Sequence, residues 1–153
     1  MTATVSGSSS AGRSPRRTAR PRVLLDANAL MLPFRGGFPL MAEVERLVPG
    51  ASVEVPASVL TELEELRRRG VAFAGAARDL AGRFPATPTS GQGDDAVLRA
   101  ARRVGAVVVT ADRGLAERLR RAGGSVLVPR DRHRLELRPG LPGPPPGRPL
   151  GNG

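Results

Sequence analysis

Four acidic residues lie far apart in the chain, each at the edge of an apolar segment: Asp26, Glu62, Asp94 and Asp112. Asp26 ends the apolar run 23–25, and Asp112 closely follows the run 106–109. If both runs are parallel strands, their carboxylates lie at the strand ends where open sheets bind ligands. Clustered carboxylates repel one another and need a compensating charge. In a chain without cysteine, the cation that suits three or four such oxygen ligands is Mg²⁺ or Mn²⁺.

The segments between these acids alternate between strand and helix patterns, which predicts an α/β fold with a parallel sheet. Strands are predicted at 22–25, 52–55, 107–110, 125–129 and 134–138, the last as an edge strand. Helices are predicted at 39–48, 59–69, 71–84, 94–104 and 113–122, and the loop 85–93 has room for a short strand. Ser58 is expected to cap the second helix, and Gly105 to end the fourth.

The composition excludes several kinds of chemistry. The chain has 153 residues, which suits one domain, and it has no Cys and a single His, His133. Cys/His zinc sites, thiol catalysis and disulfide scaffolds are therefore excluded. A Ser-His-Asp arrangement would depend on His133, and the sequence has no G-x-S-x-G motif to accompany it. No apolar run approaches the ~20 residues of a membrane span, so we expect a soluble, cytoplasmic protein without a membrane partner.

The charge is uneven along the chain. The formal net charge is +10, and all 24 basic residues are Arg. Residues 1–20 are rich in Ser, Gly and Arg and are predicted to be a disordered basic arm, and 138–153 a disordered Pro/Gly-rich tail. The predicted domain, 21–137, holds 18 Arg and all 14 acids. A basic surface around an acidic pocket suits a metal-dependent nuclease, although genome base composition also explains abundant Arg.

Each acid also has a more ordinary explanation. An Asp after a strand is most often a helix cap or a turn residue. Asp94 could cap the helix that it precedes, and Glu62 could be one of several solvated acids on its helix. Only the combination of the four, in order and in context, favours a shared site.

The chain from about residue 22 to 137 resembles a PIN domain, a small Rossmann-like nuclease fold with three α/β/α layers around a central parallel sheet. The motifs that carry the resemblance are VLLDANALMLPFR, VLTELEEL, GDDAVLRAARRVGAVVVTADRGL, VLVPR and RLEL. It looks closest to short archaeal PIN proteins related to the eukaryotic small-subunit rRNA-processing nuclease, and VapC-type toxins share the site. The resemblance implies an endoribonuclease that uses Mg²⁺ or Mn²⁺ on single-stranded RNA, in pre-rRNA processing or RNA turnover.

Carried over residue by residue, the resemblance makes Asp26, Glu62, Asp94 and Asp112 the catalytic and metal-binding acids. Asp95 is an auxiliary acid that points about 100° away from its neighbour on a helix, so the two are not equivalent. Asn28 and Thr110 are expected to orient the ligands. The implied reaction is in-line attack of water on a phosphodiester, which leaves 5′-phosphate and 3′-hydroxyl ends.

Arginines are expected to hold RNA phosphates, because guanidinium–phosphate contacts are strong and bidentate. The candidates, besides the N-terminal arm, are Arg35, Arg67, Arg68, Arg69 and Arg113. Phe34 is interpreted either as a packing residue or as a base-stacking one. A homodimer with an interface in 34–40, a toxin blocked by an antitoxin, and a non-catalytic RNA-binding scaffold are the further hypotheses.

Overall fold

The computed structural model describes residues 20–143, so the predicted arm up to residue 19 and the tail from residue 144 lie outside the described residues. Its elements are β1 (Arg22–Leu25), α3 (Ala27–Met31), the 3₁₀ helix η1 (Leu32–Phe34), α4 (Leu40–Leu47), β2 (Ser52–Pro56), α5 (Ala57–Arg68), α6 (Ala74–Ala81), β3 (Ala86–Thr87), α7 (Gly93–Val104), β4 (Val107–Val109), α8 (Arg113–Arg121), β5 (Val126–Pro129) and β6 (Leu135–Arg138).

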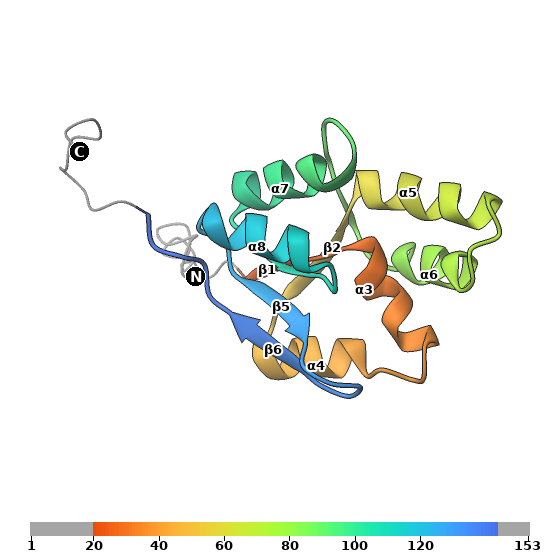
Figure 1. Ribbon diagram of the computed structural model, residues 1–153, viewed down its shortest axis with the longest axis horizontal. Coiled ribbons are helices and arrows are strands. Elements are labelled where there is room, and N and C mark those ends of the chain that lie inside the picture. Colours follow the sequence, from red (N-terminus) through yellow and green to blue (C-terminus); the bar gives the residue numbers. More distant parts are fainter. Residues whose placement is uncertain (1–19, 144–153) are drawn as a thin grey trace, which may run out of the picture.

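The strands form one six-stranded sheet in the order β3-β2-β1-β4-β5-β6. All neighbours are parallel except β5 and β6, which pair antiparallel. Helices lie on both sides of the sheet, with α7 and α8 on one side and α4 on the other (Figure 1). The predicted three-layer α/β/α fold around a central parallel sheet is therefore confirmed, and the loop 85–93 holds a short strand. The predicted edge strand is also present, and its antiparallel pairing is a feature that we did not predict.

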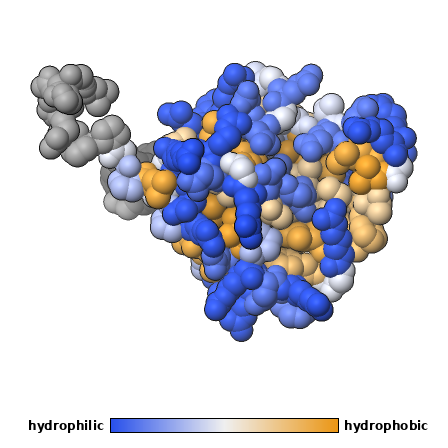
Figure 2. Space-filling view, in the orientation of Figure 1, coloured by the Kyte–Doolittle hydropathy of each residue, from blue (hydrophilic) through white to orange (hydrophobic). Residues whose placement is uncertain are grey.

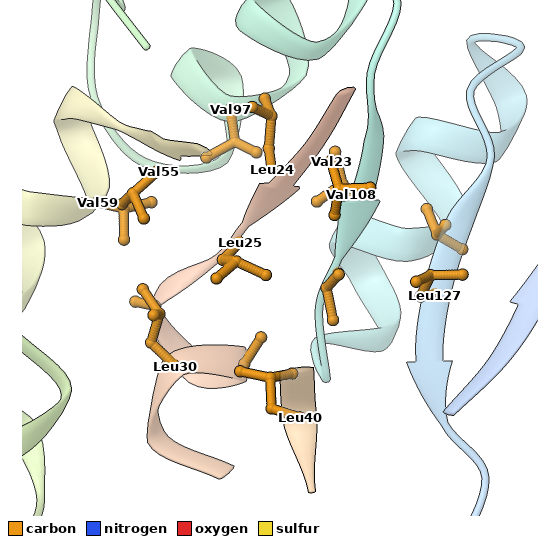
Figure 3. Packing of buried hydrophobic residues seen from close by; sticks show 14 of the residues in the cluster. Val23, Leu24, Leu25, Leu30, Leu40, Val55, Val59, Val97, Val108 and Leu127 are labelled. Atoms are coloured by element: carbon orange, nitrogen blue, oxygen red, sulfur yellow. The ribbon is translucent and has the colours of Figure 1, made fainter. Parts of the chain in front are cut away.

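The core lies on both faces of β1, which explains why that strand is a continuous apolar run. Leu24 and Leu25 are fully buried. Because successive side chains of a strand point to opposite faces, Leu24 packs beside Val97 of α7, whereas Leu25 points toward Leu30 and Leu40 (Figure 3). The two leucines thereby join both helical layers to the central strand.

A carboxylate fastens the edge strand β6 to α4. Leu135 N–H donates to Glu43 Oε1 at 2.9 Å, and Arg46 forms an ion pair with Glu43 at 2.7 Å while also donating to the Leu135 carbonyl. The hydrogen bonds from Arg46 and Leu135 lower the pKa of Glu43 to about 2. The ionised carboxylate thus fastens to α4 an edge strand that, within the described residues, pairs with β5 alone.

A second carboxylate ties together the other half of the sheet. The Arg22 guanidinium donates to both Glu54 oxygens at 2.9 and 3.1 Å, and the buried Thr87 hydroxyl donates to Glu54 Oε1 at 2.6 Å. The Arg22 bond is the main reason that the pKa of Glu54 lies below its usual range. One side chain therefore links β1, β2 and the two-residue strand β3.

Helix boundaries differ from the predictions at three places. The segment 27–34 forms α3 and η1, which the short apolar pattern did not predict. Ser58 is not a cap: α5 begins at Ala57, directly after Pro56, so Ser58 lies inside the first turn, where its N–H donates to Thr89 Oγ1 at 3.0 Å. The predicted helix 71–84 begins only at Ala74.

The late start of α6 has a backbone cause. Residues 70–73 form turns, and Phe73 has φ +69°, a left-handed conformation in which a helix of L-residues cannot continue. Gly105 ends α7 with φ +68°, as predicted, because glycine tolerates that conformation without steric cost.

Few large apolar side chains reach the surface. Hydrophilic residues cover much of the face shown in Figure 2, with apolar surface between them. Among residues 20–143, the exposed large apolar side chains are Val71, Phe73, Leu137 and Leu141. Phe38 and Leu40 are buried in the core and Phe34 packs against it, so the segment 34–40 does not offer the dimer interface that we predicted, and for Phe34 the packing interpretation holds.

No helix within residues 20–143 has the combination of length and hydropathy that crossing a bilayer requires.

Candidate active site

The predicted acids follow strands at the carboxyl edge of the parallel sheet. Asp26 follows β1, and its N–H donates to the Val109 carbonyl of β4 at 3.1 Å. The chain runs from β1 outward to β2 and β3, then returns to β4 on the other side of β1. The boundary between β1 and β4 is therefore the switch point in strand order, where open α/β sheets bind their ligands.

Asp26 is held by a network that joins the ends of these two strands. The Thr110 hydroxyl donates to Asp26 Oδ2 at 2.9 Å, and the Asn28 amide donates to the same oxygen at 3.1 Å. Thr110 Oγ1 in turn accepts the Asp112 N–H at 3.0 Å, and Asn28 Oδ1 accepts the Ala111 N–H at 2.6 Å. Asn28 and Thr110 are thus placed to orient the Asp26 carboxylate.

Asp26 is buried, with 6% of its surface exposed, and Thr110 is completely buried. Burial raises the pKa of Asp26, because the ionised form loses hydration; the Thr110 hydrogen bond acts in the opposite direction, and the charges of Asp94 and Asp112 add to the increase. Among residues 20–143, no cationic side chain contributes to the pKa of this carboxyl group.

Glu62 and Asp94 approach from two helices. Glu62 lies on α5, which follows β2, and Asp94 lies in the first turn of α7, which follows β3. Loss of hydration is the main cause that raises the pKa of each, although both residues remain accessible to solvent. The charges of Asp26, Asp94 and Asp112 raise the pKa of Glu62 further, so the four acids share one electrostatic environment.

Asp112 has a structural contact of its own. It is the N-cap of α8, and its Oδ1 accepts the Leu115 N–H at 3.0 Å. Asp112 is therefore a helix cap, which was the alternative explanation for both acids. Asp94 is not a cap, because Gln92 occupies the N-cap position of α7. The second oxygen of Asp112 remains for another partner.

Asp95 points away from the other acids. It forms an ion pair of 2.6 Å with Arg118 of α8, and this bond lowers its pKa. Arg118 also lowers the pKa of Asp94, though less than burial and Asp112 raise it. The structure thus separates the two adjacent acids: Asp94 faces the cluster, and Asp95 joins α7 to α8.

The acids are neighbours without forming a closed coordination shell. In the part of the chain that the structure describes, no three Asp, Glu, His or Cys side chains are grouped tightly enough to hold an ion. Repulsion between like charges keeps carboxylates apart when nothing compensates them. We call Asp26, Glu62, Asp94 and Asp112 the carboxylate cluster.

Two pockets flank the carboxylate cluster. The first, of about 680 Å³, is lined among others by Leu32, Asp112, Arg113, Glu117, Arg120 and Arg138, and we call it the arginine pocket. The second, of about 670 Å³, lies between α5 and the loop before α7 and includes Glu62, Asp94 and Arg69; we call it the α5–α7 pocket. The cluster acids therefore line two pockets: Asp112 lies in the arginine pocket, and Glu62 and Asp94 lie in the more acidic α5–α7 pocket.

The predicted RNA-binding arginines are distributed unevenly around this site. Arg113 and Arg69 line the two pockets. Arg67 and Arg68 form ion pairs with Glu64 and Glu65 on the same helix. Arg35, after η1, is exposed and its guanidinium lies 3.8 Å from Met31 Sδ.

Sequence reasoning missed Arg118, Arg120 and Arg138. Nothing local marks them, since Arg118 and Arg120 are two of several arginines on α8, and Arg138 stands where the predicted edge strand meets the tail. The packing of α8 against α7 and β5 brings Arg118 and Arg120 to the site, and the pairing of β6 with β5 brings Arg138.

Comparisons with known proteins identify the family and support the fold. A family model described as "PIN like domain" matches residues 23–132. The structure of the PIN domain endonuclease Utp24 superposes with a TM-score of 0.66 at 21% identity, covering 80% of this chain and 96% of that one. A crystal structure of PAE2754 from Pyrobaculum aerophilum gives a TM-score of 0.42 at 18% identity, over 64% of this chain and 86% of the other. No curated protein sequence matches the chain.

Proposed function

The chain belongs to the PIN-like domain family, and from that premise we propose that it is a metal-dependent endoribonuclease whose centre is the carboxylate cluster. The observation that carries the proposal is the convergence of four acids on the switch point of the sheet, three of them with raised pKa values. We assign the nuclease domain to residues 21–137. Asp26, Glu62, Asp94 and Asp112 are its proposed catalytic residues.

The donor chemistry of the cluster fits a hard divalent cation. Its ligands are carboxylate oxygens, which Mg²⁺ and Mn²⁺ prefer over nitrogen or sulfur. Raised pKa values mean that the ionised carboxylates are incompletely compensated by the protein, and a bound cation would supply that compensation. A divalent ion of this kind stabilises negative charge on phosphoryl oxygens and makes water a stronger nucleophile. Asp26, Glu62 and Asp94 would hold it, with Asp112 beside them.

The other residues of the site would position the cluster and the substrate. Thr110 and Asn28 fix one Asp26 oxygen, which leaves the rest of the carboxylate free to bind. Hydrolysis adds water to the phosphorus and breaks the bond to the 3′ oxygen, so that one product carries a 5′-phosphate and the other a 3′-hydroxyl.

The arginine pocket supports a polyanionic substrate. Arg113, Arg120 and Arg138 line it, against Asp112 and Glu117. Guanidinium groups match phosphate oxygens in geometry and charge, and they would align a strand beside the acids without reading its sequence. We therefore infer that the sugar–phosphate backbone lies along α8.

The test is cleavage of labelled single-stranded and structured RNA, with DNA of the same sequence, by the purified full chain. We expect Mn²⁺- or Mg²⁺-dependent cleavage of single-stranded RNA with 5′-phosphate ends, blocked by EDTA and lost in Asp26→Asn. Asp95→Asn is the matched control, because Asp95 is adjacent in sequence to a cluster acid but faces Arg118. Equal cleavage by the wild type and Asp26→Asn would refute the proposed function.

A further inference from the structure

The α5–α7 pocket differs chemically from the arginine pocket. Arg69 is the only basic residue on its wall, whereas Glu62, Glu65 and Asp94 are all acidic. A phosphate in this pocket would be repelled by more charges than attract it. The pocket is therefore suited to a neutral part of a nucleic acid and not to its backbone.

The rest of its wall offers an apolar surface and neutral hydrogen-bonding groups. Leu66 contributes partly buried apolar surface, and Ser58, Thr61, Thr89 and Gln92 contribute hydroxyl and amide groups. A nucleobase has flat apolar faces and an edge of donors and acceptors, and proteins recognise unpaired RNA bases through both. At about 670 Å³, the pocket is within the ~300–1,000 Å³ range of small-molecule sites.

Two of these groups have unused hydrogen-bonding capacity. The Ser58 hydroxyl oxygen is buried and has no hydrogen-bond partner among residues 20–143. The Gln92 side chain, at the N-cap position of α7, makes no capping bond. A buried polar atom without a hydrogen-bond partner costs free energy. Rotation of the Ser58 side chain about its Cα–Cβ bond would bring the hydroxyl to a ligand in the pocket. A hydrogen bond to this hydroxyl would contribute more binding free energy than one to a group that water already solvates.

The pocket is also held in a defined shape. Thr89 Oγ1 accepts the Ser58 N–H at 3.0 Å, which fastens the loop before α7 to the start of α5. Gly93 has φ +64°, a conformation that presents Gln92 at the start of the helix and that a side chain at position 93 would strain. Such preformed geometry lowers the entropy cost of binding.

We propose that the α5–α7 pocket binds one unstacked base of the substrate strand beside the carboxylate cluster and gives the enzyme a base preference at that position. This inference rests on the proposed function, because the pocket shares Glu62 and Asp94 with the cluster. The sugar–phosphate backbone of the substrate would then run from the arginine pocket past the carboxylate cluster. The next base would enter the α5–α7 pocket and contact α5. Ser58 and Gln92 are the residues that determine specificity.

The first experiment measures cleavage of a pool of short single-stranded RNAs, randomised at each position in turn, by the wild type with Mn²⁺. We expect one base to be favoured over the least favoured base by roughly tenfold in kcat/KM at one position next to the cut, the effect of ~1.4 kcal/mol. Ser58→Ala and Gln92→Ala should reduce that ratio to about twofold. Ser90→Ala, in the same loop but outside the pocket wall, is the matched control and should leave it unchanged.

Thermal unfolding of each variant separates recognition from folding. Ser58→Ala removes an unpaired buried hydroxyl, so its Tm should equal or exceed that of the wild type. Cleavage without any base preference, or a preference that survives in the Ser58→Ala/Gln92→Ala double variant, would overturn the base pocket and leave the proposed function intact.

A binding arm does not depend on cleavage. Fluorescence anisotropy of Asp26→Asn with labelled eight-nucleotide RNAs that differ at one position, one of them abasic there, should show the same base preference. If the wild type cleaves nothing and this preference is still found, the base pocket stands while the proposed function fails. If neither cleavage nor preference is found, both are refuted.

Discussion

Replacing Thr110 with Val tests whether the hydroxyl that bridges β1 and β4 supports catalysis. The side chain is completely buried, donates to Asp26 Oδ2 at 2.9 Å and accepts the Asp112 N–H at 3.0 Å. Valine has nearly the same shape, so the substitution removes both bonds and leaves the packing almost unchanged. The variant therefore isolates the hydroxyl.

The expected loss of stability follows from the two bonds. A hydrogen bond to a charged group contributes about 1.5–3 kcal/mol, and an N–H left without an acceptor costs ~1–3 kcal/mol. Because the Asp112 N–H is only partly buried, we take the lower half of the second range and expect a total of about 2.5–5 kcal/mol. For a domain of this size, that corresponds to a decrease in Tm of roughly 10 °C or more.

The expected loss of activity is larger than unfolding explains. Removing a group that orients a metal-binding residue typically costs ~10–100-fold in activity or metal affinity, and we expect this decrease in kcat/KM well below the Tm of the variant. Thr110→Ser keeps the hydroxyl and should recover most of the activity. A Val variant that is less stable but as active as the wild type would show that the hydroxyl serves folding alone, and an unchanged Tm would refute the buried network itself.

Three further predictions concern the cluster, the edge strand and the core. Mg²⁺ or Mn²⁺ at about 100 times its Kd should stabilise the wild type by ~2.7 kcal/mol in thermal unfolding, whereas the ion should not stabilise Asp26→Asn. In EDTA, Asp26→Asn should have a higher Tm than the wild type, because the substitution removes a buried charge. Since the pKa of Glu43 is lowered to about 2, the stability that its carboxylate contributes is complete above the unfolded pKa near 4.5 and is lost as pH falls toward 2. The Tm of Glu43→Gln should therefore be lower than that of the wild type at pH 6. On acidification, the Tm of the variant should decrease less than that of the wild type. Leu24→Ala should cost about 2–5 kcal/mol in denaturant unfolding, and Leu24→Met under ~1.5 kcal/mol; a similar cost for both would contradict the packing against α7.

The sequence predicted the layers of this fold because their signals are local. The apolar run at 23–25, the three valines at 107–109 and the glycine after α7 each determine their own element. The order of the acids then indicated one shared site, because strand ends in a parallel sheet meet at one edge.

The errors arose where the outcome depends on distant parts of the chain. Ser58 has the residue type of a cap, but Pro56 occupies the N-cap position. Thr89, from another segment, accepts the Ser58 N–H in the first turn. Family spacing favoured Asp94 over Asp95, but the ion pair with Arg118 that turns Asp95 toward α8 depends on the α7–α8 contact and could not be predicted. Residues that line the pockets are equally hidden, because they come together only after the sheet has formed.

The hydrogen bond between Thr110 and Asp26 joins residues 84 positions apart. No shorter stretch than 26–112 contains all four acids, so the centre is assembled only after three quarters of the domain has been synthesised and β4 has inserted beside β1. Contacts of such long range form late in folding. A nascent chain that has not yet reached β4 therefore lacks the complete carboxylate cluster, which exists only in the finished sheet.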